Sequence, residues 1–300
     1  MAHHTLNTEH GTADYSEIRN IRAAFFLNLT FTIIEIIGGI LTNSVAILSD
    51  ALHDFGDSIS IGAAWFFQKL SGRGRDEKYS YGYKRFTVLG AIINSLVLLT
   101  GSAVILTEAI PRLLNPVQPR VEGMIILAVL GITINGLAVF RLKKSENLNQ
   151  KVIYLHLLED VLGWFAVLIG SIVMYFTYLP VLDPILSILI SLYILYNVIK
   201  NLRESLKIVL QAIPRNIDLT KIEEHIIKLS KVDEIHDVHL WTMDGNYNVL
   251  TIHVVLKSEL NFTEQWTLKR EIRGVLKQNN IDHSTIEFES MDEKCEMADC

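Results

Sequence analysis

Apolar runs of about 20 residues recur along the first two thirds of this chain, and they limit its fold more than any other feature. A run of this length can cross the hydrocarbon core of a bilayer as a helix. Six such runs are present, at residues 22–41, 44–68, 86–110, 121–140, 152–178 and 183–199. Five of the six prolines fall outside these runs and Pro184 is the second residue of the last one, which supports the boundaries. The sequence therefore predicts an α-helical membrane protein with six transmembrane helices.

The distribution of basic residues predicts how these helices are oriented. Two loops are rich in Lys and Arg, the second-to-third loop (Lys69, Arg73, Arg75, Lys78, Lys84, Arg85) and the fourth-to-fifth loop (Arg141, Lys143, Lys144, Lys151). The other three loops hold only Arg112 and Arg120. Because Lys and Arg are enriched on the cytoplasmic side, both termini are expected in the cytoplasm. The polar segment Met1–Ser16 lacks an apolar core, so no cleavable signal peptide is expected.

The last hundred residues follow the pattern of a small soluble domain. "DLTKIEEHIIKLS" has apolar residues at helical spacing after an Asp cap. "EIHDVHLWTM" alternates as a strand, "DGN" is a hairpin turn, and "YNVLTIHVVLK" is the returning strand. A second helix, "NFTEQWTLKREIRGVLKQNN", and a third strand, "STIEFES", follow. This order predicts a cytoplasmic α+β domain with an αββαβ, ferredoxin-like arrangement. We expect a polar tail at 1–18, a transmembrane domain at 19–205, the cytoplasmic domain at 206–290 and a second tail at 291–300.

Charge and cysteine content exclude several classes of protein. The net charge of −6 and the lack of a basic stripe argue against nucleic-acid binding. The two cysteines, Cys295 and Cys300, both lie in the C-terminal tail, which rules out a disulfide framework. They remain candidates for a labile thiol pair or for metal ligands.

The second apolar run contains four ionisable residues, Asp50, His53, Asp54 and Asp57. Charge inside a membrane is energetically expensive, so such a cluster indicates a functional site. His53 and Asp57 lie one helical turn apart, and His156 and Asp160 repeat this spacing in the fifth run. At 1.5 Å per residue, Asp57 lies about 20 Å and Asp160 about 15 Å into a core of about 30 Å. The two pairs can therefore meet near the membrane midplane.

Two imidazoles and two carboxylates in a tetrahedral array favour Zn²⁺, with Cd²⁺ or Co²⁺ as alternatives. Because these ligands also bind protons, such a site suits a metal/proton antiporter. The alternative is that the four residues pair with one another or line a wet cleft without metal. Asp50 is a further candidate near an exit path or helix terminus, Asp54 can pair with a neighbouring helix, and Glu35 is either structural or linked to protons.

Four motifs together resemble the cation diffusion facilitators, a family of zinc-efflux proteins. They are "NSVAILSDALHDFGDS", "YSYGYKRFTVLGAIIN", "HLLEDVLGW" and "VDEIHDVHLW", and they are spread over nearly the whole chain. The resemblance implies a homodimer of six-span protomers with a transport site at His53, Asp57, His156 and Asp160. It also implies that the cytoplasmic domain binds regulatory metal and dimerises, with His236, His253, His283 and Glu289 as ligands. Cys295 and Cys300 are additional candidates.

Two departures from the family pattern are visible. Thr87 stands where many relatives have an acidic residue, and the loop "RLKKSENLNQ" is short and free of histidine, which is typical of a bacterial inner-membrane protein.

We therefore expect a proton-coupled exporter of divalent metal that works by alternating access, and not an enzyme. An intramembrane metalloenzyme is disfavoured because the chain lacks an H-E-x-x-H motif and a four-ligand site leaves no open position for water. A metal sensor without transport activity is the second alternative.

Overall fold

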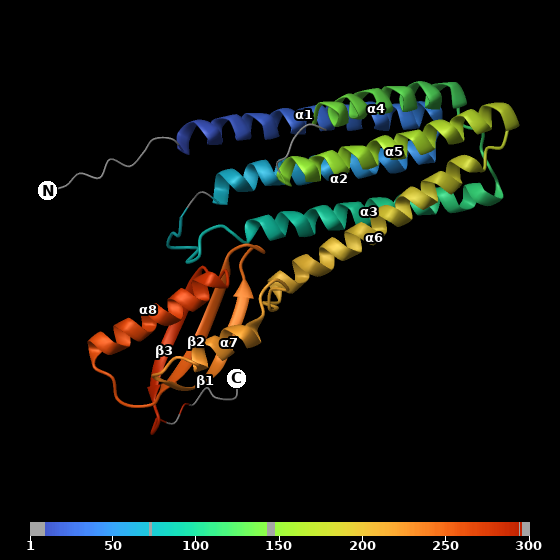
Figure 1. Cartoon of the computed structure of the whole chain (residues 1–300). Helices are drawn as coiled ribbons and strands as arrows, with labels where there is room; N and C mark the ends of the chain where they lie inside the picture. Colours follow the sequence, from blue (N-terminus) through green and yellow to red (C-terminus); the bar gives the residue numbers. More distant parts are fainter. Residues whose placement is uncertain (1–9, 72–73, 143–147, 294, 296–300) are drawn as a thin grey trace. The chain divides into compact units, whose positions relative to one another are not determined.

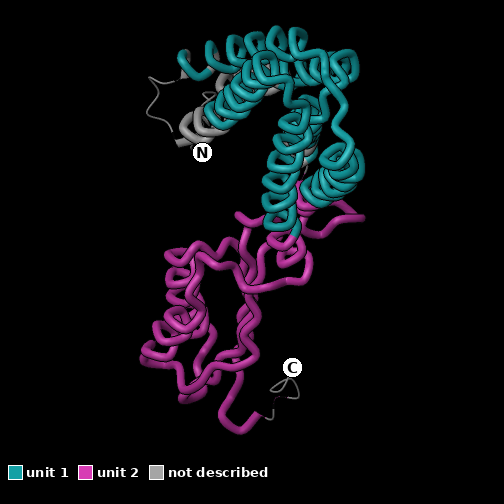
Figure 2. Tube along the Cα trace, turned by 90° about the vertical axis from the view of Figure 1, so that its right-hand side faces the viewer, with its two compact units in different colours: residues 1–72, 90–202 teal, residues 73–89, 203–300 magenta. Residues whose placement is uncertain are grey.

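A computed structural model of the chain describes residues 10–71, 74–142, 148–293 and 295. The side chains of residues 10–24, 64–65, 67–69, 71, 138, 141–142 and 148–156 lie outside the description. The described residues form eight helices and three strands (Figure 1). They divide into two compact units, one of residues 1–72 and 90–202 and one of residues 73–89 and 203–300 (Figure 2).

The first six helices correspond to the six predicted spans. They are α1 (His10–Thr42), α2 (Val45–Ser71), α3 (Phe86–Leu114), α4 (Val121–Leu142), α5 (Leu148–Thr177) and α6 (Leu182–Val209). Among the described residues, four segments are long and apolar enough to cross a membrane: Phe25–Thr42, Phe86–Leu114, Leu157–Thr177 and Leu182–Val209. In α4 the apolar part is shorter, Val121–Leu137. Helix α2 does not reach this hydropathy, because it contains His53 and three aspartates.

Two helices extend beyond the predicted boundaries. Pro111 was expected outside a helix, but α3 continues through it to Leu114. Proline removes one backbone donor, and this close to the helix end only a single turn is affected. Helix α1 begins at His10, within the segment expected to be a polar tail.

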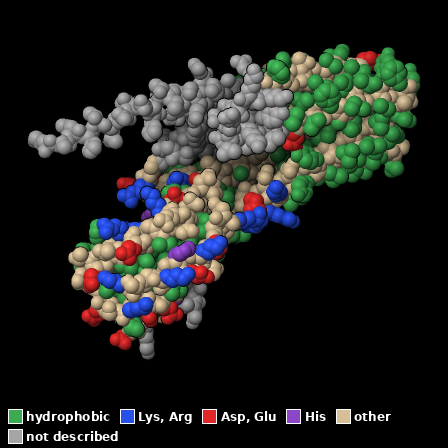
Figure 3. Space-filling view, viewed as in Figure 1, with side chains coloured by type: hydrophobic (Ala, Val, Ile, Leu, Met, Phe, Trp, Pro, Cys, Tyr) green, Lys and Arg blue, Asp and Glu red, His purple; other side chains and the backbone are tan. Residues whose placement is uncertain are grey.

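Four helices of the first unit share one apolar core around Trp164. Residues of α1, α2, α4 and α5 form this core, including Phe31, Ile47 and Met124. Trp164 of α5 packs so closely on Gly131 of α4 that a Cβ at this glycine would lie 2.4 Å from the ring. A smaller cluster of Leu98, Ile194 and Val198 joins α3 to α6. The outer surfaces of the helices carry mainly apolar side chains, as contact with lipid requires (Figure 3).

A buried carboxylate fixes the start of α2 to α6. Asp183 accepts hydrogen bonds from the Ser44 hydroxyl at 2.5 Å and from the backbone N–H groups of Val45 at 2.9 Å and Ala46 at 3.3 Å. These N–H groups belong to the first turn of α2 and have no acceptor within the helix. Asp183 therefore acts as a cap from another helix, and α2 carries the ionisable cluster.

The second unit contains the predicted αββαβ domain, which confirms the fold class. Its elements are α7 (Leu219–Ile227), β1 (Val232–Thr242), β2 (Asn248–Leu256), α8 (Phe262–Gln278) and β3 (His283–Ser290). The sheet order is β1-β2-β3, with β1 antiparallel and β3 parallel to β2. Asp218 caps α7, as expected, and Asn261 and Glu264 form a capping box at the start of α8.

Helices α7 and α8 cover one face of this sheet. Ile222 of α7 and Leu268 of α8 pack in one core with Leu250, Ile252 and Val254 of β2. Because side chains alternate along a strand, His253 lies on the opposite face of the sheet. That face carries the candidate metal ligands of the domain.

Candidate metal sites

Three of the four predicted intramembrane ligands lie close together in the first unit. His53 Nε2 of α2 is 3.8 Å from Asp57 Oδ2 on the next turn and 4.0 Å from Asp160 Oδ1 of α5. All three side chains are largely buried. His156 is a residue of α5 one turn before Asp160, and its side chain lies outside the described residues.

The spacing of these atoms suits a shared ion. Separations of 3.8 and 4.0 Å are too long for direct hydrogen bonds. Nitrogen and oxygen atoms bound to one tetrahedral zinc ion lie about 3.3–3.6 Å apart, given zinc–ligand bonds of about 2.0–2.2 Å. A contraction of a few tenths of an ångström would bring His53 Nε2 to that distance from each of the two carboxylate oxygens.

Three further carboxylates are buried beside this group. Glu35 of α1 is fully buried, Asp50 and Asp54 of α2 are nearly so, and Glu35 lies within electrostatic range of both. Asp50 faces α5, because its Oδ1 is 3.7 Å from the place where a Cβ would stand on Gly163. Asp50 is thus close to the helix that carries Asp160, while its place in the ligand set stays a prediction.

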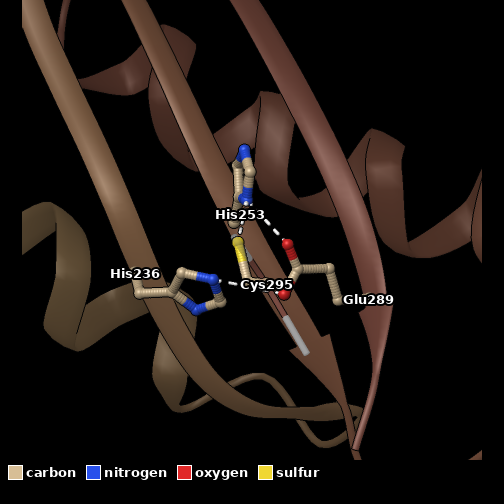
Figure 4. A group of neighbouring side chains, drawn as sticks. All are labelled: His236, His253, Glu289 and Cys295. Atoms are coloured by element: carbon tan, nitrogen blue, oxygen red, sulfur yellow. Dashed lines mark hydrogen bonds and ion pairs between the residues drawn. The ribbon is translucent and has the colours of Figure 1, made fainter. Parts of the chain in front are cut away.

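A second group of candidate ligands lies on the open face of the three-stranded sheet. It consists of His236, His253, Glu289 and Cys295, and each residue offers one donor atom within 4.8 Å of all the others (Figure 4). Three of these residues are sequence-predicted ligands, and Cys295 was an additional candidate. Two nitrogens, a carboxylate oxygen and a sulfur form a donor set that Zn²⁺ prefers. We call this group the cytoplasmic cluster.

The register of the strands explains how the cytoplasmic cluster forms. His236 of β1 stands directly opposite His253 of β2, and Glu289 of β3 pairs with Val255, the next residue on the same face of β2. After β3 the chain turns, because the N–H of Glu293 donates to the Ser290 carbonyl at 3.1 Å. This turn brings Cys295 Sγ to 3.5 Å from His253 Nδ1.

The two nitrogens of His253 face different groups. Nδ1 lies 2.7 Å from Glu289 Oε1, inside the cluster. Nε2 lies 3.4 Å from Asp237 Oδ2 and 3.5 Å from Glu287 Oε2, outside it. Carboxylates that bind the second nitrogen of a metal-ligating histidine fix its orientation and tautomer. The outer carboxylates therefore direct Nδ1 into the cytoplasmic cluster.

Asp237 was not found by reasoning from the sequence. It lies in a β-bulge between His236 and His239 and adopts a left-handed conformation with φ of 49°. The sequence signal that could have indicated the bulge is "IHDVH", in which two polar residues in a row interrupt the alternation of apolar and polar residues along the strand.

His283, the fourth ligand implied for this domain, lies apart from the cytoplasmic cluster. It begins β3 opposite Val249, four residues before His253, and its ring contacts Tyr81 edge to face at 5.6 Å between centroids. It lies six positions before Glu289, or about 20 Å along an extended strand. Cys300 lies outside the described residues.

Two family models match this chain. The model of the cation efflux transmembrane domain matches residues 21–210, and that of the cytoplasmic domain of cation efflux proteins matches residues 214–291. The chain belongs to the cation diffusion facilitator family. The resemblance inferred from the four motifs is thereby confirmed, and this facilitator is a multi-pass membrane protein of a transporter family.

Curated relatives match over almost the full chain. A "cadmium, cobalt and zinc/H(+)-K(+) antiporter" of Bacillus velezensis is 32% identical over 289 residues, which cover 95% of this chain and 92% of the relative. The metal cation efflux system protein CzcD of Cupriavidus metallidurans is 34% identical, covering 94% of this chain and 89% of the relative. The zinc transporter ZitB of Pectobacterium atrosepticum is 31% identical, covering 96% and 89%.

Proposed function

We propose that this cation diffusion facilitator exports Zn²⁺ in exchange for protons, with Cd²⁺ and Co²⁺ as further substrates. The observation that carries the proposal is the convergence of His53, Asp57 and Asp160 inside an apolar helical unit. The names of the relatives, which include zinc transporters and cadmium, cobalt and zinc antiporters, support the same substrates.

In this proposal the substrate ion binds between α2 and α5. The neutral imidazoles of His53 and His156 supply two nitrogens, and the carboxylates of Asp57 and Asp160 supply two oxygens. All four groups bind metal only when deprotonated, so protons and Zn²⁺ compete for the site. Alternating access then couples the two fluxes, because the site takes metal from the cytoplasm and releases it when protons arrive from outside.

The cytoplasmic cluster takes a regulatory metal ion in this proposal. His236, His253 and Glu289 would hold Zn²⁺ together with the Cys295 thiolate, and Asp237 would hold the His253 ring in place. The donor set and the spread of 4.8 Å support this assignment. The domain also joins two copies of the chain into a homodimer, which agrees with its match to the cytoplasmic domain of the family.

We place the protein in the bacterial inner membrane with both termini in the cytoplasm. The support is the excess of Lys and Arg in the second-to-third and fourth-to-fifth loops. This orientation puts the cytoplasmic cluster on the side from which the substrate is exported.

Transport by reconstituted protein tests the proposal. Vesicles containing the full chain should accumulate ⁶⁵Zn²⁺ when a pH gradient is imposed and lose this uptake when an ionophore collapses the gradient. Asp57→Ala should abolish the uptake, whereas Asp292→Ala, an exposed aspartate, should leave it unchanged. Uptake that ignores the pH gradient would contradict proton coupling, and no uptake at all would favour a sensor or an enzyme.

A further inference from the structure

The second unit contains a groove that neither metal site uses. It has a volume of about 380 Å³ and is lined by the loop segment 78–86, by Gln211 and by Trp241 and Met243 at the end of β1. This volume is within the range of about 300–1,000 Å³ that is typical of small-molecule sites. We call it the boundary groove.

The charge of the boundary groove is positive. Lys78 and Arg85 line it, both are exposed, and no carboxylate is among its described lining residues. In the part of the chain that the structure describes, no ion pair links either cation to an acid. The third cation of this segment, Lys84, is engaged elsewhere, with its Nζ 4.4 Å from the centre of the Tyr247 ring.

One acid of the loop, Asp76, holds the loop in shape. Asp76 Oδ1 accepts hydrogen bonds from the N–H groups of Lys78 at 2.9 Å and Tyr79 at 2.8 Å. Its Oδ2 accepts the Tyr83 hydroxyl at 2.6 Å. These bonds organise the turn that presents Lys78 to the groove, and they engage both carboxylate oxygens. The two cations are thus available to an anionic ligand.

Aromatic side chains form the rest of the wall. Tyr79, Tyr81, Phe86 and Trp241 all line the groove, and the ring of Tyr79 packs edge to face on Phe86 at 5.4 Å. Tyr and Trp are enriched at the level of lipid headgroups, because their rings are apolar and their tips are polar. A ligand that carries both an anionic group and an apolar part matches such a wall.

Chain connectivity places one end of the groove at the membrane boundary. Phe86 is the first residue of α3, a helix long and apolar enough to span a membrane, and Gln211 comes two residues after the last residue of α6. Arg85 directly precedes the apolar run that begins at Phe86, whereas Gln211 follows the apolar run of α6, which ends at Ile199, by 12 residues, or about 18 Å along a helix. Arg85 therefore lies at the depth at which phospholipid headgroups lie.

We infer that the boundary groove binds the headgroup of an anionic phospholipid. Lys78 and Arg85 contact the phosphodiester oxygens, and the aromatic wall contacts the glycerol and the first acyl carbons. The inference needs only that the chain is a membrane protein, and it does not depend on metal export.

Binding of lipid to the purified full chain tests this assignment. Short-chain phosphatidylglycerol and phosphatidylcholine are titrated onto the protein in neutral detergent, and native mass spectrometry counts the bound molecules. We expect phosphatidylglycerol to bind at least tenfold more tightly than phosphatidylcholine. The double variant Lys78→Gln/Arg85→Gln should lose about 10- to 30-fold in affinity, since each cation near an anionic lipid contributes about fivefold.

Two control variants keep the test specific. Arg273→Gln/Lys277→Gln removes two exposed cations of α8 and should bind phosphatidylglycerol like the unaltered chain. The charge-retaining double variant Lys78→Arg/Arg85→Lys should bind phosphatidylglycerol with an affinity within threefold of that of the unaltered chain. Equal losses in both neutralised variants, or no loss in the groove variant, would overturn the inference.

The same measurement separates the lipid from other occupants. Inorganic phosphate that binds as tightly as the lipid would reassign the groove to a soluble anion and overturn the lipid assignment. A groove variant that changes the monomer–dimer ratio but not lipid binding would show that a second copy of the chain occupies the groove, and would also overturn it.

Discussion

Replacing Cys295 with serine tests whether the cytoplasmic cluster is a four-ligand zinc site. The Sγ atom lies 3.5 Å from His253 Nδ1, and His236 Nε2 lies 3.2 Å from Glu289 Oε2. Both separations are close to the distance of about 3.3–3.6 Å that is expected between two ligand atoms of one tetrahedral zinc ion. Cys295 is therefore close enough to His253 to bind the same ion.

The size of the effect follows from the number of ligands. Zinc binding to small structural sites is worth about 10–16 kcal/mol, or about 2.5–4 kcal/mol for each of four ligands. Each 1.4 kcal/mol changes the dissociation constant about tenfold. Serine is a poor zinc ligand, so Cys295→Ser should weaken zinc binding at the cytoplasmic cluster by about 100- to 1,000-fold.

Cobalt provides a readout that isolates this site. Thiolate bound to Co²⁺ gives a charge-transfer absorbance, and the chain has only two cysteines, Cys295 and Cys300. The full chain and its Cys300→Ser variant should show this band, and zinc should displace it. Cys295→Ser should lose the band, and competition with a chelator should give its weakened zinc affinity. A band that survives Cys295→Ser, or an unchanged zinc affinity, would refute the four-ligand site.

Three further predictions follow from single side chains. Asp237→Asn should weaken zinc binding by about 10- to 100-fold in the same titration, because the carboxylate 3.4 Å from His253 Nε2 orients that ring. Asp183→Ala removes the acceptor of two backbone N–H groups and a hydroxyl, each worth about 1–3 kcal/mol, and should lower the thermal midpoint in detergent clearly more than Asp183→Asn. The pKa of Glu264 is lowered by the hydrogen bond that it accepts from the Asn261 N–H and by the nearby Lys231. The ionised Glu264 side chain therefore stabilises the start of α8 above the ordinary carboxyl pKa, and this stabilisation is lost as the pH falls through the lowered pKa. In the unaltered chain, the α8 amides should therefore lose protection against hydrogen exchange as the pH falls, and Glu264→Gln should make this loss smaller. The same loss in both proteins would contradict this role.

The αββαβ domain could be predicted from local patterns because each element carries its own signal. The β-branched residues of "NVLTIHVVL" after a "DGN" turn identify β2, and Asp218 marks the start of α7 by offering its side chain to a free N–H group. The six spans could be counted for a similar reason, since apolar length is a local property. Pro111 was misjudged because a helix tolerates proline near its end, where few backbone bonds remain to be lost.

The sequence by itself determined which residues can bind metal, since only a few side chains combine a donor atom with a position that is otherwise apolar. Tertiary structure decided which of them meet. Strand register put His236 opposite His253 and left His283 four residues away along β2, because a strand advances about 3.3 Å per residue. The turn after β3 brought Cys295 to a histidine 42 residues earlier in the chain. Such contacts depend on the folding of distant segments, and no local pattern records them.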